Sequence, residues 1–232
     1  QVLHHPGPWR HQDADAIRPG SSRSAFWLRL RVRHVGASAG TLVLDLASVR
    51  QDHVRWVVAD TAGRILLERD TGERLARSSR LVDAPSIALP LAMAPGAVRD
   101  VYIRLRSHDG LFEPLPIQLS GEAAFHQHTS AHIGRLALYA GALLALVLYN
   151  LFVAAATRTP AFWAYVTYGA GLLLWSTAYH GLGFQFLWPE QPVLNHQLPL
   201  VGGAIAHAGA WWFIPRYLRL DERPELGWTL RL

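Results

Sequence analysis

The chain has 232 residues, of which half are hydrophobic, and 22 basic against 17 acidic side chains give it a formal net charge of +5. Every basic residue is Arg, interspersed with acids and part of no recognisable nucleic-acid motif, so we interpret the bias as a coding preference and expect no nucleic-acid partner. The absence of Cys excludes disulfides, thiolate metal sites and cysteine nucleophiles.

The charges divide the chain into two different parts. Residues 1–130 carry 16 of the 22 Arg and 13 of the 17 acids, whereas residues 131–215 carry only Arg135, Arg158 and Glu190. The chain begins at Gln1 and its single Met is Met93, so we expect the natural start, with or without a secretory signal, to lie upstream.

Three apolar runs follow one another in the second part, at 136–156, 161–179 and 198–214. A helix needs roughly 20 residues to cross the hydrocarbon layer. The first two runs meet this length, and the third meets it if its helix begins a few residues earlier. Buried helices of a soluble protein are the alternative, but three such runs with short connectors favour three transmembrane helices.

The placement of Arg predicts the orientation of these helices. The segment 180–197 has no Lys or Arg, so the positive-inside rule places it and the N-terminal half outside. Arg135, on the outer side, is the exception. The basic residues expected in the cytoplasm are Arg158, Arg216, Arg219 and Arg223.

The segment 180–196, HGLGFQFLWPEQPVLNH, predicts an outward loop at the membrane surface. Its aromatic rings are of the kind that gather at the interface, its glycines permit turns, and its prolines end the flanking helices. A buried β-strand is the alternative. The residues that form this interface signature are Gly181, Gly183, Phe184, Phe186, Trp188 and Pro189.

Small residues recur at four-residue spacing in the first and third runs, which predicts close helix packing. They are Ala137, Gly141 and Ala145, and Gly202, Ala206 and Ala210. Asn150 and His207 are polar groups at membrane depth, for which we expect hydrogen bonds between helices, with a direct signalling role as the alternative.

The first part alternates apolar and polar residues with period two from residue 24 to 119, which predicts many short antiparallel strands. Gly- or Pro-bearing breaks separate the runs, and this spacing favours an all-β antiparallel sandwich. The runs lie at 26–34, 41–46, 53–60, 63–68, 85–91, 98–107 and 115–119.

These patterns together predict a β-sandwich followed by three transmembrane helices. The parts are a leader or edge segment at 1–23, a sandwich at 24–120, a linker at 121–135, membrane helices at 136–220, and a cytoplasmic tail or remainder at 221–232.

The arginines that alternate with the apolar positions are the best candidates for a ligand face. Guanidinium forks bind hydroxyls or carboxylates, and sugars stack on aromatic rings. The alternative is a solvated sheet face, with the tryptophans in the core. The candidates are Trp27, Arg29, Arg31, Trp56, Arg104 and Arg106.

No catalytic motif is present: the chain lacks GxSxG, HExxH, a P-loop and GxGxxG. His126, His128 and His132 suggest a metal site or pH sensor, but polar residues at a membrane boundary are the simpler interpretation. We therefore assign no catalytic residue, no metal and no cofactor.

Several stretches resemble one bacterial family, the seven-transmembrane receptors with diverse intracellular signalling modules. LYAGALLALVLYNLFV at 138–153 resembles that family's first helix, and GLGFQFLWP at 181–189 resembles the loop after its second helix. Trp27-Leu28-Arg29, and Pro95-Gly96 ahead of Val101-Tyr102-Ile103-Arg104, resemble its second type of extracellular domain. The resemblance implies a jelly-roll sensor for small solutes, carbohydrates among them, seven helices and a cytoplasmic module that is not in this chain.

The predicted function is therefore the sensor part of a receptor in the bacterial inner membrane, not an enzyme. We expect membrane lipid and a small extracytoplasmic solute as partners, with carbohydrate as a candidate class and a homodimer as an option. A membrane-anchored carbohydrate-binding or adhesion module is the main alternative. A transporter or membrane enzyme would need paired ionisable groups in the spans, which offer only Asn150 and His207.

Overall fold

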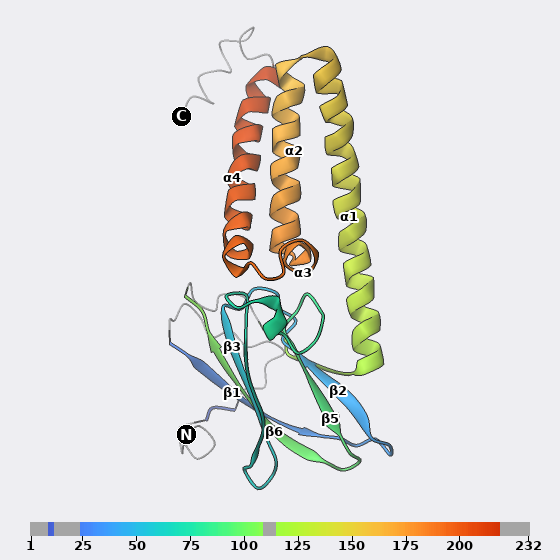
Figure 1. The fold of residues 1–232 in the computed structure, drawn as a ribbon, viewed down its shortest axis with the longest axis vertical. Helices are drawn as coiled ribbons and strands as arrows, with labels where there is room; N and C mark the ends of the chain where they lie inside the picture. The colour runs from blue at the N-terminus through green and yellow to red at the C-terminus, as the bar shows by residue number, and fades with distance from the viewer. Residues whose placement is uncertain (1–8, 12–23, 109–114, 219–232) are drawn as a thin grey trace. The chain divides into compact units, whose positions relative to one another are not determined.

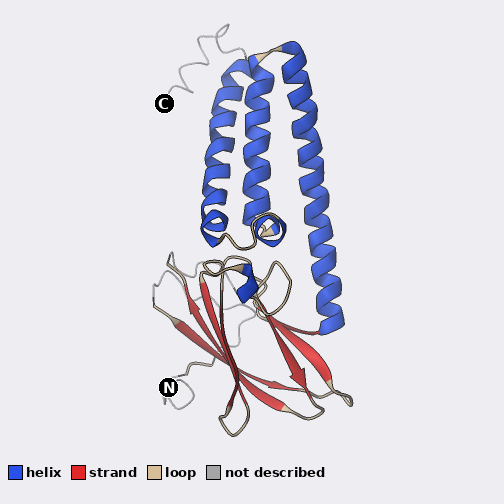
Figure 2. Ribbon diagram, in the orientation of Figure 1, coloured by secondary structure: helices blue, strands red, loops and turns tan. Residues whose placement is uncertain are grey.

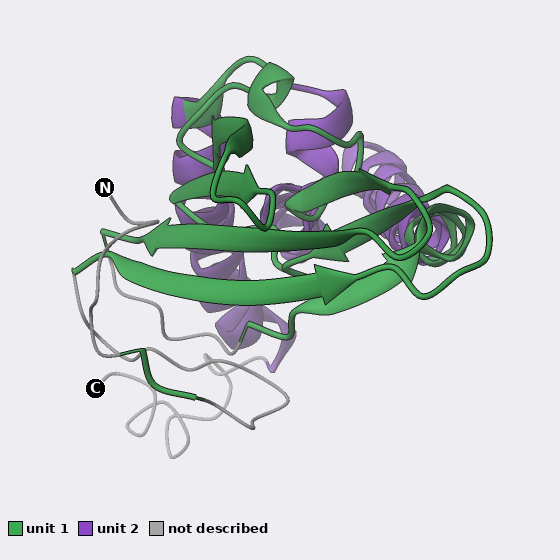
Figure 3. Cartoon of the chain, turned by 90° about the horizontal axis from the view of Figure 1, so that it is seen from below, with its two compact units in different colours: residues 1–131, 189–192 green, residues 132–188, 193–232 purple. Residues whose placement is uncertain are grey.

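The computed structural model of the protein describes residues 9–11, 24–108 and 115–218. Apart from Trp9, Arg10 and His11, the predicted leader lies outside the described residues, as do the predicted tail at 221–232, Arg219 and Arg223. The chain forms two compact units, residues 1–131 with 189–192, and residues 132–188 with 193–232 (Figure 3).

The described residues of the first unit form seven strands in two antiparallel sheets (Figures 1 and 2). All seven fall on the predicted runs, so the prediction of antiparallel strands is confirmed. The four-stranded sheet has the order β1-β6-β3-β4 and the three-stranded sheet the order β5-β2-β7. Their bounds are β1 Phe26–Arg33, β2 Gly40–Asp45, β3 His53–Ala59, β4 Ile65–Thr71, β5 Ala88–Met93, β6 Val98–Arg106 and β7 Gln118–Gly121.

Side chains of both sheets form one hydrophobic core. The inward positions of β1 are the predicted ones, because Val32 is buried and Phe26, Leu28 and Leu30 pack against the core. Trp56 of β3 is the largest fully buried side chain. Period-two alternation thus reflects one apolar and one polar face of the four-stranded sheet.

The loop after β4 leads to a short 3-10 helix, η2 (Arg77–Ser79). Gly72 lies so close to Asp52 that a Cβ atom would collide with the Asp52 carbonyl, 2.8 Å from its carbon atom. The Glu73 N–H donates to Gln51 O at 2.8 Å and the Arg74 N–H donates to Asp52 O at 3.3 Å. The loop is therefore held against the segment that precedes β3.

Helix α1 (Glu122–Thr157) begins directly after β7 and continues for 36 residues. Residues 122–135, expected to form a linker, are its first turns, because this polar segment holds good helix formers and no proline. Phe125 is buried in a small cluster with Val43, Ala84 and Ala88 of the first unit.

The second unit also contains α2 (Pro160–Tyr179), the short α3 (Leu182–Phe186) and α4 (Pro192–Tyr217). Helix α4 begins six residues before the predicted run, with Pro192 in its first turn, where a missing N–H costs nothing. Glycines let α2 and α4 approach at backbone distance: a Cβ on Gly171, Gly202 or Gly209 would collide with main-chain atoms of the other helix.

This packing partly corrects the predicted small-residue faces. Gly202 and Ala206 are buried as predicted, but Gly209 rather than Ala210 is the third buried small residue of α4. In α1, a Cβ on Gly141 would meet no atom within 4 Å. All three residues of the face predicted on α1 are exposed: Ala137, Gly141 and Ala145.

Among the described residues, α1 is the one helix that is long and apolar enough to be a candidate membrane span, by length and composition. Of the three membrane spans that the sequence predicts, the first, at 136–156, therefore lies in a helix that meets these criteria. Helix α2 carries five Trp or Tyr residues among its apolar ones, and α4 includes Pro199, Pro215 and two histidines.

Candidate functional site

The predicted arginine face is the side of the four-stranded sheet that faces away from the core. In the antiparallel register of β1 and β6, Trp27 lies opposite Arg104, Arg29 opposite Tyr102 and Arg31 opposite Asp100. Residues that lie opposite each other project to the same side of a sheet. These side chains therefore share one surface, as the alternation predicts, and we call it the outer face.

Carboxylates pair with part of the positive charge on the outer face. Arg31 donates two hydrogen bonds to Asp100, from Nε at 2.8 Å and from Nη2 at 2.9 Å, and Arg29 lies 3.7 Å from the same carboxylate. These bonds, chiefly from Arg31, hold the pKa of Asp100 below its usual range although burial opposes the shift.

Arg55 of β3 repeats this arrangement with Asp70 of β4, through hydrogen bonds of 2.6 and 2.8 Å. The Arg55 guanidinium lowers the pKa of Asp70. Fork-to-carboxylate pairs of this kind fix the orientation of both partners.

An aromatic platform lies between these ion pairs. Tyr102 is only 5% exposed although it projects from the outer face. The Arg29 guanidinium lies 5.6 Å from the centre of the Tyr102 ring, and the Trp9 ring centre lies 6.3 Å from it with the planes tilted by 58°. Arg29 and Trp9 thus cover the Tyr102 ring, and Trp9, which is 43% exposed, is the aromatic ring that this group presents to solvent.

The other predicted ligand residues divide between the two faces. Arg104 is half-buried beside Trp27, and Arg106 is exposed near the end of β6. Trp56 pairs with Ile103 and is fully buried in the core, so it does not lie on the outer face. The core position, one of the two alternatives from the sequence, is the observed one for Trp56.

The segment 181–189 forms a compact turn between α2 and α4. Gly181 has a left-handed φ of 80°, and Gly183 lies against the Trp188 ring so closely that a Cβ would overlap it. The Trp188 Nε1–H donates to Asn195 Oδ1 at 3.4 Å. Phe184 is buried, whereas Phe186 is 62% exposed.

Asn150 and His207, which the sequence predicts at membrane depth, each contact a carbonyl oxygen of the preceding helical turn. Asn150 Nδ2 donates to Leu146 O at 2.9 Å, and His207 Nδ1 lies 2.7 Å from Gly203 O. Both contacts lie within one helix, four residues back. A carbonyl of the preceding turn is close enough to satisfy a short polar side chain.

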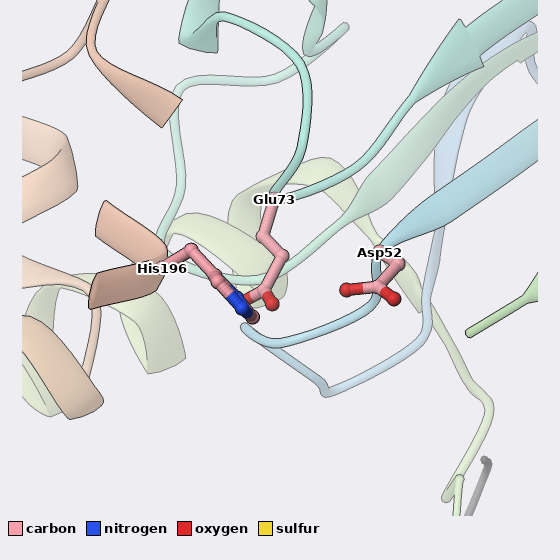
Figure 4. Close-up of side chains that lie close together, drawn as sticks. All are labelled: Asp52, Glu73 and His196. Atoms are coloured by element: carbon pink, nitrogen blue, oxygen red, sulfur yellow. The ribbon is translucent and has the colours of Figure 1, made fainter. Parts of the chain in front are cut away.

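Two buried carboxylates were not found from the sequence, because they lie in loops without periodicity. Asp52 and Glu73 are 4% and 5% exposed (Figure 4). Burial tends to raise the pKa of Asp52, but hydrogen bonds from the His108 N–H at 2.6 Å and from Arg74 outweigh it, so the pKa of Asp52 is lowered. Both carboxylates secure the base of the loop that follows β4.

The three histidines before the first span do not form a metal-binding group within the described part of the chain. His126 Nε2 lies 4.0 Å from the Glu122 carboxylate in the first turns of α1, and both side chains are exposed. These residues fit a polar helix surface.

Comparisons with known proteins agree with this architecture. A family model described as "7TMR-DISM extracellular 2" matches residues 1–119, and a model described as "7TM diverse intracellular signalling" matches residues 135–232. No curated protein matches the chain. The first match includes the sheets and the second most of α1 and the helices after it. The chain therefore belongs to the family of seven-transmembrane receptors with diverse intracellular signalling modules, and contains its second type of extracellular domain together with part of its membrane domain.

Proposed function

We propose that this chain is the solute-sensing part of a receptor in the bacterial inner membrane. Its β unit is a jelly-roll-like sandwich in the periplasm, and its helices cross the membrane more than once. The observation that carries the proposal is the joining of the two family segments by one helix, because α1 follows β7 without a break. Signal output belongs to a cytoplasmic module that is not in this chain.

The multi-pass arrangement is supported by helix length and by the distribution of charge. Helices α2 and α4 have 20 and 26 residues, enough for about 30 and 39 Å at 1.5 Å per residue. Arg158 lies between α1 and α2, whereas the connection from 180 to 191 has no Lys or Arg. The positive-inside rule then places Arg158 in the cytoplasm and the connection in the periplasm.

For the ligand, we propose a small solute of the carbohydrate class at the outer face. The support is the combination of the exposed Trp9 ring, which lies against the buried Tyr102, and the guanidinium groups of Arg29 and Arg104 on one surface. Aromatic faces bind sugar rings, and guanidinium groups donate hydrogen bonds to hydroxyls.

The topology is tested by cysteine labelling, since the chain has no Cys of its own. Single Thr157→Cys and Gln191→Cys variants are treated in cells with a permeable outer membrane, using a thiol reagent that does not cross the inner membrane. We expect modification at 191 only. Labelling at 157 with none at 191 would invert the proposed topology, and equal labelling of both in intact cells would exclude a span between them.

A further inference from the structure

A small cavity of about 250 Å³ lies in the first unit, away from the outer face. It is lined by the segment that contains η2 and by two residues of the connection between α3 and α4. This connection, Pro189–Pro192, belongs to the first unit (Figure 3). The polar residues of the lining are Arg77, Ser78, Arg80, Asp83 and Glu190.

Backbone contacts hold both walls of the cavity in place. The η2 wall follows Gly72, whose close approach to Asp52 fixes the start of the loop. The Arg77 N–H donates to Pro189 O at 2.9 Å, which joins η2 to the connection. The cavity is thus part of the folded unit.

Two guanidinium groups converge on this cavity. Arg77 Nη2 donates to Ala84 O at 3.2 Å, and Arg80 Nη1 donates to the same oxygen at 3.0 Å. Burial lowers the pKa of Arg80 to about 10, and repulsion from Arg77 contributes to the shift. Arg80 therefore remains protonated at neutral pH, and two like charges lie side by side.

Arg77 has donor capacity that the described residues do not use. Its side chain is only 9% exposed, and its Nη1 is buried without a hydrogen-bond partner in the part of the chain that the structure describes. A buried guanidinium N–H is costly to leave without an acceptor. A carboxylate that replaces Asp83 on Nη2 would lie beside Nη1 and bring an acceptor to it.

Two carboxylates with exposed side chains lie at this cavity. Asp83 accepts a hydrogen bond from Arg77 Nη2 at 2.5 Å, but its side chain is 85% exposed. Glu190 accepts hydrogen bonds from the Ser78 N–H at 3.3 Å and the Ser78 hydroxyl at 3.2 Å, both at the surface. The exposed Glu190 contacts contribute little stability, and the exposed Asp83 carboxylate can turn into solvent when an incoming carboxylate takes its place on Arg77.

We propose that this cavity binds a small organic acid, whose carboxylate takes the place of Asp83 on Arg77 and lies beside Arg80. The pair Arg77–Asp83 shows that a carboxylate fits the Arg77 fork, and a guanidinium binds a carboxylate with defined geometry. The site is distinct from the outer face and does not depend on carbohydrate binding there.

Ligand occupancy would also act on the connection between α3 and α4. A bound carboxylate repels Glu190 and weakens its hydrogen bonds to Ser78. Because Pro192 is the first residue of α4, release of Glu190 frees the chain segment that leads directly into that helix. The site would thus report the presence of an acid to the helical unit through the covalent chain.

The experiment uses the full chain in detergent, with Gln191→Cys carrying an environment-sensitive dye. Acetate, succinate and citrate are titrated at constant ionic strength set with sodium chloride, with glucose as the neutral probe, and binding heat is measured on unlabelled protein. We expect saturable heat and a dye response with at least one acid and none with glucose.

Three variants separate the parts of the proposal. Arg77→Gln should weaken acid binding by about tenfold or more, because it removes charge-assisted hydrogen bonds, whereas the control Arg64→Gln, at an exposed surface ion pair, should leave it unchanged. Arg77→Lys, which retains the charge but not the fork, should fall between. Glu190→Gln should bind the acid at least as tightly and show a reduced dye response.

Several outcomes would overturn the inference. Binding of none of the three acids, equal binding by a folded Arg77→Gln variant, or a response to glucose alone would exclude the acid site. Heat of binding without any dye response would exclude the coupling through Glu190. These titrations use purified protein, so their failure leaves the topology experiment unaffected.

Discussion

Two adjacent glycines of α4 allow the packing of the helical unit to be tested with a matched pair of substitutions. A Cβ on Gly202 would lie 2.5 Å from the Trp175 nitrogen, 2.9 Å from its Cα and 3.0 Å from Gly171 O, all main-chain atoms of α2. A Cβ on Gly203 meets only the Trp175 Cδ1, at 3.7 Å, an ordinary contact. The same methyl group is therefore excluded at one position and accommodated at the next.

The magnitudes follow from two opposing contributions. Replacing Gly by Ala within a helix stabilises it by about 0.8–1 kcal/mol. Overpacking against atoms that cannot rotate away costs about 1–3 kcal/mol. We therefore expect Gly203→Ala to raise the free energy of unfolding by up to about 1 kcal/mol, and Gly202→Ala to lower it by up to about 2 kcal/mol.

The measurement is reversible unfolding of the helices in mixed detergent micelles, followed by circular dichroism, for both variants and the parent chain. Gly141→Ala in α1 is a second control, because no atom lies within 4 Å of its Cβ position. Equal stabilities of Gly202→Ala and Gly203→Ala would refute the close approach of α2 and α4.

Two further predictions concern the outer face. Asp100→Asn should lower the free energy of unfolding by about 1 kcal/mol at neutral pH, since its main partner Arg31 is largely exposed. Because folding lowers the pKa of Asp100, its carboxylate stabilises the fold above the pKa of about 3.9 that Asp has in the unfolded chain, and this stabilisation is lost as the pH falls below that value. The free energies of unfolding of the parent and Asp100→Asn should therefore converge in acid. A difference between them that persists at pH 2 would contradict this cause. In a thermal-shift screen with sugars, Arg29→Ala and Arg104→Ala should each reduce the stabilisation by a binding sugar, and an equal shift in the parent and both folded variants would exclude these arginines from its site.

The strands were predictable because the four-stranded sheet has one apolar and one polar face. The alternation in Phe26–Arg33 is the direct consequence of one buried side, and it also assigns Arg29 and Arg31 correctly to the outer face. Trp56 follows the same rule, since it lies between the buried Val54 and Val58 at two-residue spacing. The alternation of Val54, Trp56 and Val58 in the sequence is therefore enough to predict that Trp56 lies in the core.

The remaining features depend on contacts that leave no local pattern. Hydropathy detects the apolar length of α1 but not its polar first turns, which are helical all the same. Ser78 and Glu190 meet across a separation of 112 residues, and neither lies in a periodic segment. A cavity formed by such loops becomes visible only once the chain is folded, so none of its arginines was a candidate from the sequence.

The unbroken start of α1 has a consequence for hybrid receptors made from this chain. Residues 122–135 extend about 21 Å along the helix axis, and Phe125 fixes the first turn by its burial beside Val43. Each residue inserted or deleted after Phe125 turns everything downstream by about 100° about the axis. A fusion to a foreign helix must therefore preserve angular phase: seven added residues nearly restore the original direction, whereas two turn the downstream face by more than half a revolution.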